Sequence, residues 1–76
     1  MIETVIEQCR RHVAEGAQRI TRQHVLIAKL ERNGHQSALP NAYVLLAGLQ
    51  DTQRLSEEHL AREIIKQARP QDPWRW

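Results

Sequence analysis

Apolar and small side chains recur at alternating intervals of four and three residues along the first part of the chain. This spacing averages about 3.5 residues, so the side chains line one narrow stripe of an α-helix. The pattern stops at Asn33-Gly34, and glycine tolerates the left-handed backbone that follows many helices. We therefore expect a helix over about residues 2–33. Its stripe consists of Ile2, Ile6, Cys9, Val13, Gly16, Ile20, Gln23, Ile27 and Leu30.

A second periodic segment predicts another helix over about residues 38–68. We expect the hydroxyl of Ser37 to cap its first turn. In the alternative, Leu39 is the cap and Pro40 takes the first helical position. Pro70 ends regular helix. The stripe of this segment consists of Leu39, Ala42, Leu46, Leu49, Gln53, Ser56, Leu60 and Ile64.

The connection between the two segments is short, which forces neighbouring helices to run antiparallel. The predicted fold is therefore all-α, an antiparallel helical hairpin over residues 1–69 followed by a Pro/Trp tail over residues 70–76.

The predicted pairing places Gly16 opposite Ser56, where two small residues would let the helices approach closely. In the alternative, Gly16 is only a tolerated defect, since glycine in a helix interior weakens the helix. Gln23 and Gln53 have two readings: they set the register from buried positions, or they lie at wet edges of the stripe.

Six large apolar residues lie beside the two stripes: Val5, Val25, Leu26, Val44, Leu45 and Leu55. A core this small seldom supports a fold without help. We expect a homodimer that forms a four-helix bundle about a two-fold axis. The alternatives are a monomer covered by its own tail and a complex with a different protein. The residues expected to form the core and the dimer are Ile6, Val13, Gly16, Ile20, Ile27, Leu46, Leu49 and Leu60.

The charge balance suggests an alternative function. The chain has 11 Lys and Arg against 9 Asp and Glu, a net charge of +2, and the basic excess lies in the first helix. Arg11, Arg22 and Lys29 share one outer face, which predicts phosphate contacts in a nucleic-acid-binding protein. However, Glu15 and Glu31 interrupt this face and no recognition-helix motif is present, so an ordinary solvated surface explains it better.

A weaker alternative is a metal site at the open end of the hairpin. Cys9 and His12 lie one turn apart on the first helix, and His59 and Glu63 lie one turn apart on the second. Antiparallel pairing brings the four together as a Zn²⁺ ligand set. The spacings are also common by chance, and Cys9 is equally explained as a small core residue.

The sequence indicates neither catalysis nor a cofactor. Its serines and threonines have no evident base beside them, and there is no phosphate-binding loop. A single cysteine excludes an intrachain disulfide and suits a reducing compartment. The chain opens without a secretory pattern, and no apolar run is long enough to cross a bilayer. We therefore expect a cytoplasmic protein without membrane contact.

The tail carries Trp74 and Trp76 on either side of Arg75. Tryptophan and arginine are enriched at binding hot spots. The two tryptophans are therefore candidates for contact with a partner, and packing against the hairpin is the alternative.

Several runs of residues resemble a group of short, uncharacterised bacterial proteins that are predicted helical hairpins with a Gly-His-Asp-type turn. The resemblance is carried by His12-Val13-Ala14-Glu15-Gly16, Arg19-Ile20, Gln23, Ile27-Ala28-Lys29-Leu30, Asn33-Gly34-His35, Ala42 and Leu45-Leu46. This chain has Gln36 and Ser37 where the group usually has Asp and Thr. The resemblance implies a hairpin in a bacterium and no particular activity. Because the residues themselves give little support for catalysis, we expect a small non-catalytic interaction or regulatory protein.

Overall fold

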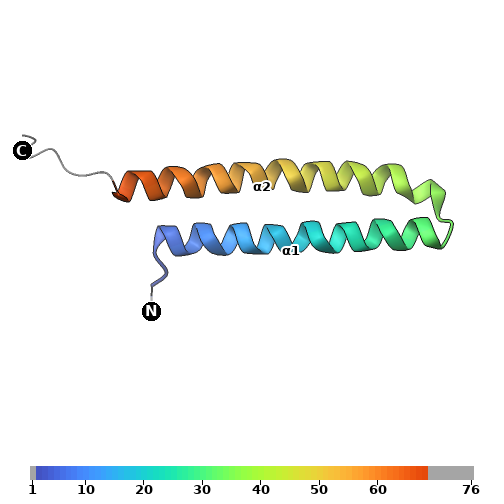
Figure 1. Ribbon diagram of the computed structural model, residues 1–76, viewed down its shortest axis with the longest axis horizontal. Coiled ribbons are helices and arrows are strands. Elements are labelled where there is room, and N and C mark those ends of the chain that lie inside the picture. Colours follow the sequence, from blue (N-terminus) through green and yellow to red (C-terminus); the bar gives the residue numbers. More distant parts are fainter. Residues whose placement is uncertain (1, 69–76) are drawn as a thin grey trace, which may run out of the picture.

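The computed structural model describes residues 2–68, which form two long antiparallel helices joined by a tight turn (Figure 1). Helix α1 spans Val5–Arg32, the short 3-10 helix η1 spans Gln36–Ala38, and helix α2 spans Leu39–Ala68. The predicted all-α antiparallel hairpin is confirmed, and this part of the chain contains no strand.

Helix α1 begins at Val5 rather than at residue 2, because Thr4 stops it with a capping box. The Glu7 amide donates to the Thr4 hydroxyl at 3.1 Å, and the Thr4 amide donates to the Glu7 carboxylate at 3.2 Å. The Thr-x-x-Glu spacing that signals this cap is readable in the sequence.

The turn follows the end of α1 at Gly34, which has a φ of 73°. The His35 amide donates to the Leu30 carbonyl at 2.9 Å, and the Gly34 amide donates to the Glu31 carbonyl at 3.3 Å. These are the two bonds of a Schellman ending. The prediction that Ser37 caps α2 is wrong, because Ser37 lies inside η1 and α2 follows directly from it.

The core is the seam between α1 and α2. Its buried apolar residues are Cys9, Ile27, Ala42 and Leu46, with Ile20, Leu30 and Leu39 packed against part of this cluster. All the residues predicted for core and dimer packing are buried or half-buried here: Ile6, Val13, Gly16, Ile20, Ile27, Leu46, Leu49 and Leu60. Their side chains therefore already pack between the two helices of a single hairpin.

Two details of the seam follow from having only two helices. Within residues 2–68, no side chain is completely enclosed, since no third element covers the seam. The α2 stripe also ends differently from the prediction: Glu63 is half-buried and Ile64 is exposed. Position 63 continues the alternation of three and four residues after Leu60, whereas position 64 turns away from α1.

Over the residues that the structure describes, neither helix is both long enough and apolar enough to cross a membrane.

Candidate functional site

Two buried glutamines link the helices from opposite directions. Gln23 of α1 donates from Nε2 to the carbonyl oxygen of Ala42 at 2.8 Å, and Gln53 of α2 donates from Nε2 to the carbonyl oxygen of Val13 at 2.7 Å. Both glutamines are less than 10% exposed. Each bond satisfies a buried amide that would otherwise be costly. The reading in which the glutamines set the register is the one that the structure supports.

Gly16 is a point of close approach, but its partner is Gln53 rather than the predicted Ser56. A Cβ added at Gly16 would lie 2.9 Å from the Cδ atom of Gln53 and would collide with its Oε1 atom. The pairing is therefore displaced by about one helical turn from the prediction. The displacement arises at the turn. Because η1 begins directly after His35, the chain is helical again before residue 38, where the second helix was predicted to begin. Residues of α2 therefore lie opposite α1 earlier in the sequence than predicted.

A polar groove lies beside the contact between Gly16 and Gln53. Its volume is about 340 Å³, and it is lined by His12, Glu15, Gly16, Arg19, Leu49, Thr52, Gln53 and Ser56. In the described part of the chain, no hydrogen bond joins His12 to the hydroxyl of Thr52 or Ser56. The carboxylate of Glu15 is already paired with Arg11 and Arg19.

The predicted metal ligands come together only in part. Cys9 Sγ lies 3.9 Å from His59 Nδ1, and His59 Nε2 lies 3.6 Å from Glu63 Oε1. His12 instead lines the polar groove. Among residues 2–68, no group of three or more Cys, His, Asp or Glu is placed to hold a metal ion. The four-ligand site is therefore not formed, because the displaced register puts Cys9 beside His59 rather than beside Glu63.

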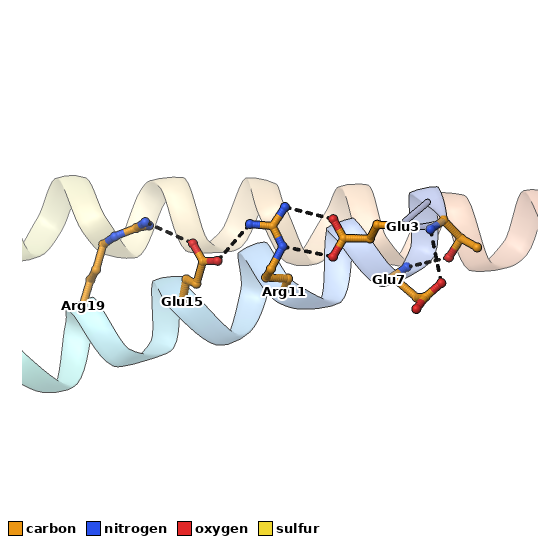
Figure 2. Close-up of polar contacts among 6 residues, drawn as sticks. Glu3, Glu7, Arg11, Glu15 and Arg19 are labelled. Atoms are coloured by element: carbon orange, nitrogen blue, oxygen red, sulfur yellow. Dashed lines mark hydrogen bonds and ion pairs between the residues drawn. The ribbon is translucent and has the colours of Figure 1, made fainter. Parts of the chain in front are cut away.

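A ladder of ion pairs runs along the outside of α1, with Glu15 between two arginines (Figure 2). Arg11 donates to both carboxylate oxygens of Glu3 at 2.9 and 3.0 Å and to Glu15 at 3.1 Å. Arg19 reaches Glu15 at 3.5 Å. Arg11 thus has two carboxylate partners, while Arg22 and Lys29 form no ion pair within residues 2–68. The basic face predicted for nucleic-acid contact therefore has one of its three cations neutralised.

The hydrogen bond from Arg11 lowers the pKa of Glu3. We expect Arg11→Gln to return this pKa toward its ordinary value of about 4.5. The pKa of Glu3 is therefore lower in the folded chain than in the unfolded chain. The contact stabilises the fold at pH values above the unfolded pKa, and this stabilisation is lost as the pH falls through the folded pKa. A carboxyl-carbon NMR titration measures the change. Arg22→Gln is the matched control, and an unchanged Glu3 pKa in Arg11→Gln would contradict the assignment.

The strongest candidate for contact with another molecule is apolar. Val44, Leu45 and Leu55, which we call the α2 apolar surface, are 72%, 54% and 60% exposed. All three lie away from the buried stripe residues Ala42, Leu46 and Gln53. Helix α1 exposes three large apolar residues, Val5, Val25 and Leu26, whereas α2 exposes six, which also include Tyr43, Ile64 and Ile65.

Trp74 and Trp76, the predicted partner contacts in the tail, lie outside the described residues.

No protein-family model matches the chain, and no curated protein or solved structure is significantly similar to it.

Sequence reasoning named the three residues of the α2 apolar surface as uncovered, but it missed Gly48 between them. Gly48 lies inside α2, and a Cβ added there would meet nothing within 4 Å. The spacing of Gly48 to Val44, Leu45 and Leu55 can be read from the sequence. Only the structure shows that a side chain at position 48 would fit in the hairpin.

Proposed function

We propose that this chain is a small, non-catalytic interaction protein that self-associates as a homodimer, in the cytoplasm of a bacterium. The observation that carries the proposal is the α2 apolar surface, Val44, Leu45 and Leu55, which is more than half exposed at every position. Burying apolar side chains of this size is the main favourable contribution to association.

The seam of the hairpin cannot serve as the dimer contact without being opened, because its stripe residues already face the other helix of the same chain. Self-association therefore has to use outer surfaces. This changes the form of the four-helix assembly: two closed hairpins pack side by side, each keeping its own seam.

The α2 apolar surface is small compared with a standard interface of about 800 Å² per partner. We therefore expect association in the micromolar to millimolar range rather than a permanent dimer. Such weak, reversible pairing suits a regulatory or adaptor role better than a structural one.

Sedimentation equilibrium from about 10 μM to 1 mM tests the proposal, over the range expected for a small interface. The expected result is a rise from the monomer mass of 8.9 kDa toward twice that value, with no change in helical circular dichroism. A chain that stays monomeric at every concentration would overturn the proposal. A partner of different sequence would then become the better explanation of the α2 apolar surface.

A further inference from the structure

This inference rests on the proposed self-association and specifies its geometry. We propose that α2 pairs antiparallel with α2 of a second copy, and that Leu55 of each copy inserts into a hole on the other formed by Asn41, Val44, Leu45 and Gly48.

The four residues of the hole have the spacing that knobs-into-holes packing requires. They lie at positions i, i+3, i+4 and i+7 of one helix, where their side chains surround a single depression. Asn41, Val44 and Leu45 are all exposed. Gly48 contributes no side chain, and the space above it is open. The depression is therefore wide at Gly48 and apolar at Val44 and Leu45, which suits a leucine side chain.

The inserting residue, Leu55, lies on the same side of α2 as the hole that receives it. Leu55 follows Gly48 by seven residues, which is two helical turns, and it is 60% exposed. A helix that carries both the knob and the hole is self-complementary about a two-fold axis. When Leu55 of one copy enters the hole of the other, the reverse contact forms at the same time.

The distribution of charge favours the antiparallel over the parallel arrangement. Residues 36–50 contain no charged side chain. The following part of α2 contains Asp51, Arg54, Glu57, Glu58, Arg62, Glu63 and Lys66. Antiparallel pairing sets the charged half of one helix against the uncharged half of the other. Parallel pairing would place the charged half of each helix beside the same half of the second copy, and like charges in contact oppose association.

Gly48 supplies the independent observation. Glycine inside an exposed helix is unfavourable relative to alanine. The close contact with Gln53 explains the glycine at position 16, whereas nothing among residues 2–68 explains the one at position 48. A leucine of a second copy seated above Gly48 does explain it.

Cysteine cross-linking tests the alignment in a Cys9→Ala background. Asn41→Cys and His59→Cys come opposite each other in the proposed pair. Copies of the same variant instead place their cysteines about 27 Å apart along the helices, beyond the reach of a disulfide. We expect an oxidised mixture of the two variants to form at least tenfold more disulfide dimer than either variant alone, and mass spectrometry to show the 41–59 linkage. Equal or stronger cross-linking within one variant would overturn the alignment.

A charge placed in the hole tests the contact itself. We expect Gly48→Lys to weaken dimerisation at least tenfold in sedimentation equilibrium, while helicity is kept or increased because lysine is the better helix former. Gln50→Lys adds the same charge on another face of α2 and should leave dimerisation unchanged.

The two proposals fail differently. A native chain that is monomeric at 1 mM overturns the proposed function together with this inference. A native dimer that Gly48→Lys does not weaken, or that Gln50→Lys weakens equally, overturns only the α2 pairing and leaves self-association standing.

Discussion

Leu46→Ala is expected to lower the free energy of unfolding of the hairpin by about 2–4 kcal/mol. Leu46 is only 8% exposed and forms one buried cluster with Ile27 and Ala42. The truncation removes apolar contact and leaves a cavity that two rigid helices cannot fully close. Since small domains have only a few kcal/mol of net stability, we expect the variant to be largely unfolded at room temperature.

Leu45→Ala is the matched control, because the same change is made at the neighbouring position, which is 54% exposed. It should cost less than about 1 kcal/mol in the isolated hairpin. Urea titration followed by circular dichroism, at low micromolar concentration to avoid self-association, measures both variants. Equal losses would mean that the seam between α1 and α2 is not the stabilising core.

Gly16→Leu is expected to destabilise the hairpin by about 2–3 kcal/mol, although leucine is the better helix former. Even a Cβ at this position collides with the end of the Gln53 side chain. A leucine would displace Gln53, break its bond to the Val13 carbonyl and leave a buried amide without a partner. It would also press against α2 where Gln53 fills the space beside Gly16.

Gly48→Leu makes the same change on the open face of α2, where nothing lies within 4 Å. We expect it to stabilise the isolated hairpin by about 0.5–1 kcal/mol through helix propensity. Thermal unfolding at low concentration compares the pair. The double variant Gly16→Leu with Gln53→Ala should recover part of the loss, because the smaller side chain makes room for the leucine. If Gly16→Leu were as stable as Gly48→Leu, the close approach would be wrong.

The sequence predicted the elements well because their signals are local. Alternating spacing of three and four residues defines a helical face whatever that face contacts, and Gly34 marks the turn through its own backbone preference. The start of α1 was readable as well, in the spacing of Thr4 and Glu7.

The contacts of the candidate site could not be predicted in the same way, because they join residues that are far apart in the sequence. The partner of Gly16, the burial of Gln23 and Gln53, and the separation of His12 from His59 all follow from the register between α1 and α2. Several registers would have satisfied the same apolar stripes, so periodicity could not distinguish them. The direct passage from η1 into α2 and the two glutamine bonds select one of them.

The chain by itself thus determined that two amphipathic helices form and fold back on each other, since helix formation and reversal depend on neighbouring residues. Only the tertiary structure decided which side chains meet across the seam and which are left outside it. The physical reason is that a stripe specifies a direction around a helix axis, whereas contacts also require a position along that axis, and this position is set by atoms far apart in the sequence.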